Sequence, residues 1–221
     1  MLFVLYISVA LAAYLLGSVP TGYLAGRLKG LDIRTVGSGN IGATNVFRTL
    51  GKAAGVTVLA VDLLKGFLAC GLLVKLLYLG FGAPADPDGI LRERLAILAG
   101  ICAILGHNYT CWLKFKGGKG IATTAGVMLA LMPLAFAIAL GIWVMVLTLT
   151  RYVSVASITS AVALPFAAYG TGSRGVLLGV TVVLGALAVY KHKGNLQRLR
   201  NGTEPKITSR RNEPANSKPS N

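Results

Sequence analysis

The N-terminal stretch MLFVLYISVALAAYLLGS, Met1–Ser18, contains no charged side chain. A helix needs about 20 predominantly apolar residues to cross the hydrocarbon core of a bilayer. The apolar character continues to about Leu24, and no lysine or arginine precedes it, although a cleaved secretory signal normally begins with positive charge. The sequence therefore predicts a retained membrane span from Leu2 to about Leu24.

Similar apolar stretches recur along the whole chain. Ile121 to Thr150 is too long for one straight pass, and Met132-Pro133 interrupts it where proline removes a helix hydrogen bond, so two shorter helices are expected there. The other expected spans are Ala53–Leu79, Leu95 to about Leu113, Tyr152–Tyr169 and Val176–Tyr190. Hydrophobic residues make up 54% of the 221, and the mean hydropathy is +0.68. The sequence thus predicts an all-α polytopic membrane bundle of seven helices, some of them short.

The positive charges predict the orientation of this bundle. Short cytoplasmic loops collect lysine and arginine. These residues gather between the first two spans, between Lys114 and Lys119, and from Lys191 onward, whereas the loop GAPADPDGILRER also carries acidic residues. We therefore expect the N-terminus outside and the C-terminus in the cytoplasm. Seven crossings fit, five fit if two helices are short or re-entrant, and six do not.

The domain organisation follows from the same pattern. Residues 1–208 are expected to form one transmembrane domain, and residues 209–221 a disordered basic and polar tail. Cys70, Cys102 and Cys111 show no metal-ligand spacing, so no metal site is predicted. The net charge of +15 is explained by topology and by attraction to anionic lipid, and no soluble domain exists to bind nucleic acid.

A polar segment, VGSGNIGATNVFR at Val36–Arg48, follows the first span on the predicted cytoplasmic side. Closely spaced glycines let backbone amides converge on an anion, and Arg48 offers a guanidinium fork suited to phosphate. Glycine and asparagine also serve tight turns and helix ends, so the segment alone leaves both interpretations open. It matches no nucleotide-binding pattern.

A second polar segment, GHNYTCWLKFKGGKGIATT at Gly106–Thr124, repeats this chemistry before the fourth helix. Gly117, Gly118 and Gly120 expose amides at a predicted helix start, where the helix dipole favours an anion. Lys116 and Lys119 add positive charge, and the sequence does not decide which of the two lies closer to a bound phosphate.

The third segment, HKGNLQRLRNGTEPKI at His192–Ile207, follows the last span. His192 and Asn195 become stronger site candidates because they lie on the same predicted membrane face as the other two polar segments. Glu204 is expected to brace the site. Within the second span, Asp62 and Lys65 lie three residues apart on one helix face, and a mutually paired couple that braces the bundle is the favoured interpretation. These residues together predict a site for one or two phosphate groups at the membrane boundary.

Three classes remain open on this chemistry: a lipid-phosphate enzyme, an organic-phosphate transporter and an anionic-lipid-binding membrane scaffold. Acyltransferases with thioester donors often carry a His-x4-Asp pair, but the residues five positions after His107 and His192 are Trp112 and Gln197.

The segments DIRTVGSGNIGATNVFR, GHNYTCWLKFKGGKGIAT and HKGNLQRLRNGTE resemble the three signature motifs of the bacterial acyl-phosphate glycerol-3-phosphate acyltransferases. Their order and spacing match over nearly the whole chain. Thr110, Ile121 and Lys193 stand where proline, valine and arginine are usual in that family.

The resemblance implies a multi-pass enzyme of the bacterial plasma (inner) membrane with its active site at the cytoplasmic face. It would transfer a fatty acyl group from acyl phosphate to the 1-hydroxyl of sn-glycerol 3-phosphate, without a cofactor, and release lysophosphatidic acid and phosphate. The partner implied is the soluble phosphate acyltransferase that makes acyl phosphate.

The resemblance also implies roles for single residues. Those expected to hold glycerol 3-phosphate are Arg48, Lys116, Ser154, His192 and Asn195, and those expected to hold the donor phosphate are Ser38, Gly39, Asn40, Thr44 and Asn45. Among these, the direct catalytic candidates are Arg48, His192, Asn195 and Ser38. His192 is the candidate base if positioning and anion binding are not sufficient.

Overall fold

The computed structural model describes residues 1–207, and these residues are helical without strands. In chain order the helices are α1 (Leu2–Ser18), α2 (Thr21–Leu28), α3 (Ala43–Leu50), α4 (Lys52–Leu68), α5 (Val74–Gly80), α6 (Ile90–Asn108), α7 (Ile121–Leu131), α8 (Pro133–Thr150), α9 (Val153–Gly170), α10 (Gly175–Lys191) and α11 (Lys193–Arg200). A π-helical turn, Ala69–Leu73, joins α4 to α5. The predicted domain limit at 208 and the tail 209–221 lie outside the described residues.

Most of the predicted spans appear as long helices. Within residues 1–207, five helical segments are long and apolar enough to cross a membrane, or six if the bent pair α10 and α11 is one span, by length and composition. The predicted break at Met132-Pro133 is confirmed, because Met132 ends α7 and Pro133 occupies the first position of α8. With 11 residues, α7 is about 16 Å long, roughly half of the hydrocarbon thickness. The number of full crossings and the orientation of the termini stay predictions.

Two features of the chain path differ from the sequence prediction. The first apolar stretch is not one helix, because the chain leaves α1 at Val19 and restarts as α2 after Pro20. The short helices α3 and α11 were not expected. Both are amphipathic and too short to give a span signal, and both lie within the polar segments.

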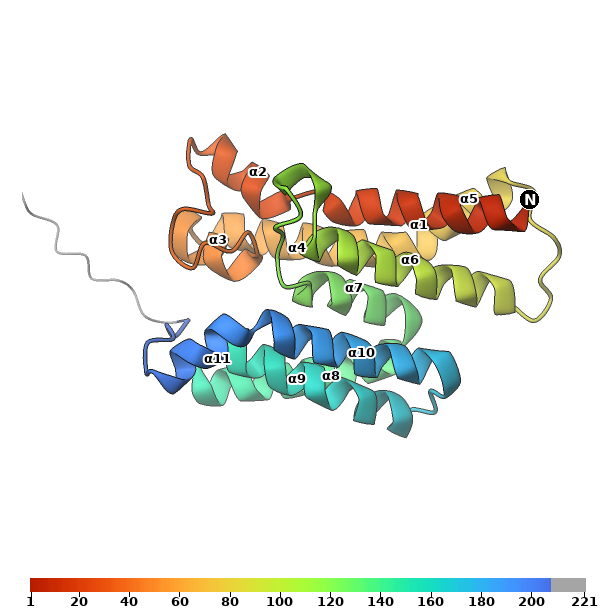
Figure 1. Ribbon diagram of the computed structural model, residues 1–221. Helices are drawn as coiled ribbons and strands as arrows, with labels where there is room; N and C mark the ends of the chain where they lie inside the picture. The colour runs from red at the N-terminus through yellow and green to blue at the C-terminus, as the bar shows by residue number, and fades with distance from the viewer. Residues whose placement is uncertain (208–221) are drawn as a thin grey trace, which may run out of the picture.

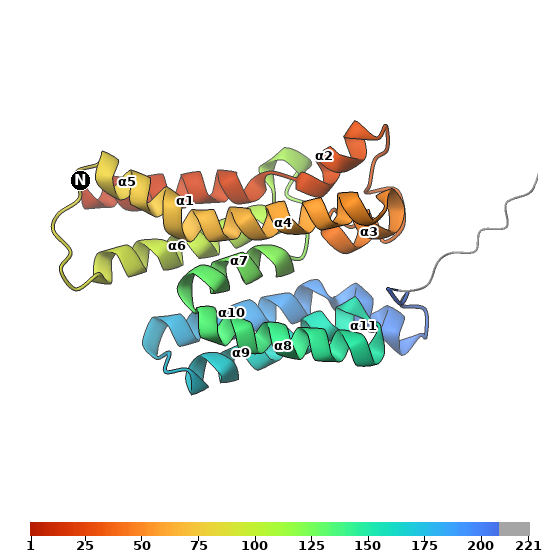
Figure 2. The same cartoon turned by 180° about the vertical axis from the view of Figure 1, so that it is seen from behind.

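The helices pack in two groups, with α7 between them. α1 lies along α6, α4 lies along α7, and α9 packs against both α8 and α10 (Figures 1 and 2). Glycines allow the close approaches: a Cβ added at Gly126 of α7 would overlap the carbonyl of Leu63 in α4, and one at Gly66 would overlap that of Thr123. Small residues at helix contacts are the usual means of tight packing in membranes.

The polar segments gather at one end of the bundle. α2, α3, the loop before α7 and α11 all lie at the end opposite the N-terminus (Figure 1). α6 ends there at Asn108, α7 begins there after Gly120, and α10 ends there at Lys191. Segments more than 50 residues apart in sequence therefore meet at a single polar end.

Candidate active site

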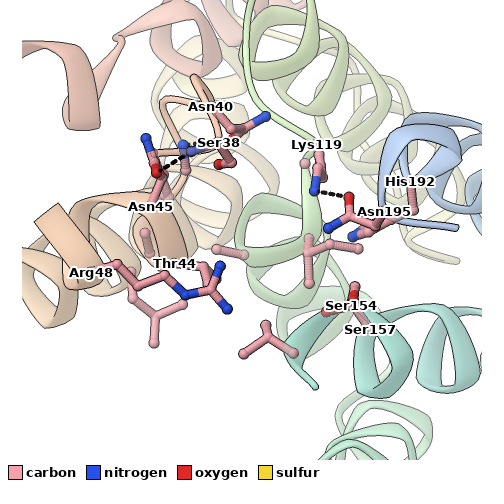
Figure 3. A pocket seen from close by; sticks show the side chains of 18 of the residues that line it. Ser38, Asn40, Thr44, Asn45, Arg48, Lys119, Ser154, Ser157, His192 and Asn195 are labelled. Carbon is pink, nitrogen blue, oxygen red and sulfur yellow. Dashed lines mark hydrogen bonds between the residues drawn. The ribbon is translucent and has the colours of Figure 1, made fainter. Parts of the chain in front are cut away.

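A cavity of about 130 Å³ opens at this polar end and is lined from all three polar segments. Figure 3 shows side chains of α3, of the loop before α7 and of α9 and α11 around it. The predicted site residues that line it are Ser38, Asn40, Thr44, Asn45, Arg48, Lys119, Gly120, Ser154, His192, Asn195 and Glu204. Gly39, Lys116, Gly117 and Gly118 belong to the predicted site but do not line this cavity.

The two lysines of the second segment are placed differently. Lys119 lines the cavity and donates a hydrogen bond to Oδ1 of Asn195 (Figure 3). Lys116 is exposed and outside the cavity. Of the two lysines, Lys119 is therefore the one placed to bind a molecule in the cavity.

The glycines of this segment serve a purpose other than the one expected. The amides of Gly117 and Gly118 donate to the carbonyls of Asn108 and His107, at 3.2 and 3.0 Å. These amides are therefore engaged by the end of α6 and do not face an anion. Gly120 does line the cavity, and its φ of +81° explains the need for glycine at that position.

Two helix N-termini supply the free amides instead. Ala43 and Thr44 begin α3, Ile121 and Ala122 begin α7, and all four residues line the cavity. Among residues 1–207, no acceptor takes the backbone N–H groups of these four residues. Free amides and the positive end of the helix dipole together favour a bound anion at each terminus.

The first segment is held by its own asparagines. Asn45 is buried; its Nδ2 donates to the carbonyls of Ile33 and Val36, and its Oδ1 accepts from the amide of Ser38 at 2.9 Å. Oδ1 of Asn40 accepts from the amide of Gly42, just before α3. Gly39 adopts a φ of +67° in the turn. Asn45 therefore shapes the loop that presents Ser38 and the start of α3.

A hydrogen-bond network joins the second and third segments. Oδ1 of Asn195 accepts from Lys119, and its Nδ2 donates to Glu204 at 2.6 Å. The same carboxylate accepts from Ser154 at 2.8 Å and from Nε of Arg198 at 2.8 Å. Although burial alone would raise the pKa of Glu204, these hydrogen bonds outweigh it and lower the pKa, so the carboxylate is ionised at neutral pH.

Arg48 extends from α3 into the cavity with unused donors (Figure 3). Its Nη2 donates to the carbonyl of Pro205 at 2.9 Å, but its buried Nε has no hydrogen-bond partner in the described part of the chain. Leaving a buried donor unpaired costs about 1 to 3 kcal/mol, and more for a charged group. An anion in the cavity would accept from this donor.

The charges around the cavity leave a positive excess. Asp62 is paired with Lys65 at 2.8 Å, and Glu204 with Arg198 at 2.8 Å. Arg48 and Lys119 have no carboxylate within ion-pair distance in residues 1–207. Two uncompensated cations facing one small cavity match the charge of a phosphate monoester dianion.

His192 is buried at the edge of the cavity, where α10 ends. Its Nδ1 lies 2.7 Å from the carbonyl oxygen of Ala188. Because a carbonyl only accepts, we assign the proton to Nδ1, which leaves Nε2 to contact a molecule in the cavity.

Sequence reasoning missed several lining residues. For Asp62, a structural pairing with Lys65 was the favoured interpretation, and His107 and Arg198 are not among the predicted site residues, although all three line the cavity. Ser157 follows Ser154 by nearly one helical turn, which could have indicated it. Trp143, which donates to Ser157 Oγ at 3.2 Å, carries no sequence signal because it lies within the uniformly apolar α8.

The chain has clear relatives in sequence. Residues 7–202 match the family described as glycerol-3-phosphate acyltransferase. A glycerol-3-phosphate acyltransferase of Geotalea daltonii is 47% identical over 194 residues, covering 88% of this chain and 93% of the relative. That of Geobacter sulfurreducens is 45% identical over 192 residues, covering 87% and 92%.

Solved structures agree with the sequence matches. The crystal structure of PlsY, an integral membrane glycerol 3-phosphate acyltransferase, in its glycerol 3-phosphate form is 38% identical with a TM-score of 0.80, covering 91% of this chain and 94% of that one. Its lysophosphatidic acid form has a TM-score of 0.77 at 37% identity and the same coverage. Family match, relatives and fold agree over nearly the whole described chain. The chain therefore belongs to the glycerol-3-phosphate acyltransferase family and is an integral membrane acyltransferase.

Proposed function

We propose that this enzyme transfers a fatty acyl group from acyl phosphate to the 1-hydroxyl of sn-glycerol 3-phosphate, giving lysophosphatidic acid and phosphate. The observation that carries the proposal is that two cations, Arg48 and Lys119, face one cavity together with the free amides of two helix N-termini, and neither has a carboxylate at ion-pair distance within residues 1–207. This arrangement suits two phosphate groups side by side. A transporter or a lipid scaffold would not need two anions held in contact.

The acceptor is assigned to the half of the cavity with the unpaired cations. Arg48 and Lys119 would neutralise the phosphate of glycerol 3-phosphate, with Ser154, His192 and Asn195 around it and Glu204 as the brace. The family resemblance implied Lys116 as the lysine that binds the phosphate of glycerol 3-phosphate. We assign this role to Lys119, because of the two lysines only Lys119 lines the cavity.

The donor phosphate is assigned to Ser38, Asn40 and Thr44 with the free amides at the start of α3. Its acyl chain would lie in a second cavity of about 250 Å³, which continues from the first between α4, α7, α8, α9 and α10. Both cavities share Trp143 and Ser157, and the second is lined by apolar side chains such as Met128, Phe136 and Leu164. A polar site opening into an apolar one fits an acyl phosphate.

The proposed acyl transfer depends more on alignment of the hydroxyl with the acyl phosphate than on a strong base. The hydroxyl oxygen bonds to the acyl carbonyl carbon, the bond from that carbon to the phosphate oxygen breaks, and phosphate leaves with the electron pair. The hydroxyl proton passes to a phosphate oxygen. Alignment alone can supply effective molarities of about 10⁵ to 10⁸ M, and fixed donors stabilise the developing charge.

The membrane orientation belongs to the same proposal. We place the polar end in the cytoplasm of a bacterial plasma membrane, with the N-terminus outside and α7 as a short helix among seven passes. The lysines and arginines at the polar end support this orientation. The soluble enzyme that makes acyl phosphate could then deliver its product to the same face.

The product decides between the candidate functions. Purified protein in detergent, given acyl phosphate and glycerol 3-phosphate, is expected to form lysophosphatidic acid and phosphate in equal amounts. Acyl-CoA in place of acyl phosphate serves as the donor control and is expected to give no product. Absence of product from acyl phosphate, with folded protein, would contradict the proposal and favour a transporter or scaffold.

The pH dependence follows from Lys119. Burial lowers the pKa of its ammonium from 10.5 to about 8, with Glu204 opposing the shift and Arg198 adding to it. The charged form that holds phosphate is therefore lost as pH rises through about 8. We expect kcat/KM for glycerol 3-phosphate to fall above that pH, and Lys119→Arg to remove the fall because arginine stays charged. The same alkaline fall in the arginine variant would contradict this assignment.

A further inference from the structure

A buried cluster of charged and titratable groups lies beside the proposed acceptor site. Asp62 and Lys65 of α4 and His107 of α6 are 2%, 4% and 5% exposed. The proposed reaction gives none of them a role. Ionisable groups within membrane helices are costly and call for an explanation, and a bracing ion pair accounts for Asp62 and Lys65 but not for His107.

Lys65 satisfies three acceptors at once. Its Nζ lies 2.8 Å from Asp62 Oδ1, 3.0 Å from the carbonyl oxygen of Val19 and 2.9 Å from His107 Nδ1. An ammonium has three donors and no acceptor, so these contacts use all of its protons. Thr21 Oγ1 also donates to Asp62 Oδ1, at 3.1 Å. The break between α1 and α2 is therefore tied to α4 and α6 through Lys65 and Asp62.

These contacts determine the tautomer of His107. Because Lys65 can only donate, Nδ1 of His107 accepts, and we assign the imidazole proton to Nε2. The distance of 3.6 Å from Nδ1 to Asp62 Oδ1 is too long for a competing hydrogen bond. The ring is thus held in one orientation, with its Nε2 edge away from Lys65.

The Nε2 edge of His107 lies against Gly118. A Cβ added at Gly118 would overlap Nε2 and would lie 2.9 and 3.0 Å from Cε1 and Cδ2 of the ring. Gly118 is not among the glycines with positive φ, so its backbone would tolerate alanine. Glycine is needed there because the imidazole occupies the space that a side chain would take.

We propose that His107 is a positioning residue: its imidazole, oriented by Lys65 and Asp62, supports Gly118 and thereby sets the position of Lys119 and of the start of α7. Gly118 immediately precedes Lys119, and its amide is bonded to the His107 carbonyl. Backbone and side chain of one residue thus both locate the segment that carries the phosphate-binding cation. The inference rests on the proposed function, which supplies the ligand.

The two sides of this contact can be changed separately. Gly118→Ala is expected to raise KM for glycerol 3-phosphate about tenfold or more, because the methyl displaces the imidazole or the loop, while KM for acyl phosphate stays within about twofold. His107→Asn keeps an acceptor for Lys65 but removes the ring edge, and we expect a smaller rise in the same KM. The double variant should bind glycerol 3-phosphate better than Gly118→Ala alone, because the methyl then fits the vacated space.

Gly117→Ala provides the matched control. A Cβ at Gly117 would overlap the backbone carbonyl of His107, which no change of the His107 side chain can relieve. His107→Asn should therefore rescue Gly118→Ala but not Gly117→Ala. If Gly118→Ala does not accumulate as folded protein, the same selective rescue is read as the yield of monodisperse protein.

Several outcomes would overturn the proposal. In one, the double variant is no better than Gly118→Ala in KM, in dissociation constant for glycerol 3-phosphate or in folded yield. In another, both glycine variants are rescued equally. A change confined to kcat or to the acyl phosphate KM would also contradict it. Wild-type protein that binds glycerol 3-phosphate but forms no lysophosphatidic acid would instead overturn the proposed function, since the binding assay can still test the rescue.

Discussion

Lys119→Ala is expected to lower kcat/KM for glycerol 3-phosphate by roughly ten- to a hundredfold, whereas Lys116→Ala should leave it within about twofold. The two lysines lie three residues apart in the same segment, but only Lys119 lines the cavity. Lys119 also contacts Asn195, which is bonded to Glu204, so its loss removes a phosphate ligand and leaves the Asn195 oxygen without its donor. Steady-state kinetics in detergent, with the acyl donor saturating, measure both effects.

The comparison of these lysines controls for net charge, since each variant removes one positive charge from the same loop. Equal losses for both would indicate that the loop acts only as a general positive surface. A large loss for Lys116→Ala alone would show that the cavity lined by Lys119 is not the acceptor site.

Arg48→Ala should have the larger effect, a loss of roughly a hundredfold or more in kcat/KM. Its buried Nε has no hydrogen-bond partner among residues 1–207, and within those residues its guanidinium is, with Lys119, one of two cavity-lining cations without a carboxylate at ion-pair distance. A guanidinium can bind phosphate through two parallel hydrogen bonds, which lysine cannot reproduce. Arg48→Lys is therefore expected to recover only part of the activity.

The control for Arg48 is Lys52→Ala. Lys52 is exposed at the start of α4, close in sequence to Arg48, and does not line the cavity. Its loss should change kcat/KM by no more than about twofold. Full activity in Arg48→Lys would show that charge alone is sufficient, and near-normal activity in Arg48→Ala would remove Arg48 from the acceptor site.

Local sequence patterns determined much of this molecule. Charge-free apolar runs such as Met1–Ser18 require helices in a membrane, and Pro133 required the break between α7 and α8. The clustering of glycine, asparagine and basic residues outside the apolar runs identified the three segments that meet at the cavity. These features are readable because they depend on composition and on neighbours within a few positions.

Tertiary structure decided which groups of each segment face the cavity. The glycine pattern predicted exposed amides, but the amides of Gly117 and Gly118 donate to carbonyls at the end of α6. The free amides are those at the starts of α3 and α7. Likewise, Asp62 and His107 are 45 residues apart in sequence and meet only because the middle of α4 packs beside the C-terminal end of α6. Hydropathy and residue spacing predict the local structure of a single segment, such as a helix and its ends. Distances between segments depend on how closely the helices pack. Glycines such as Gly66 and Gly126 allow the close approach of α4 and α7, but the sequence around each glycine does not show which helix it contacts.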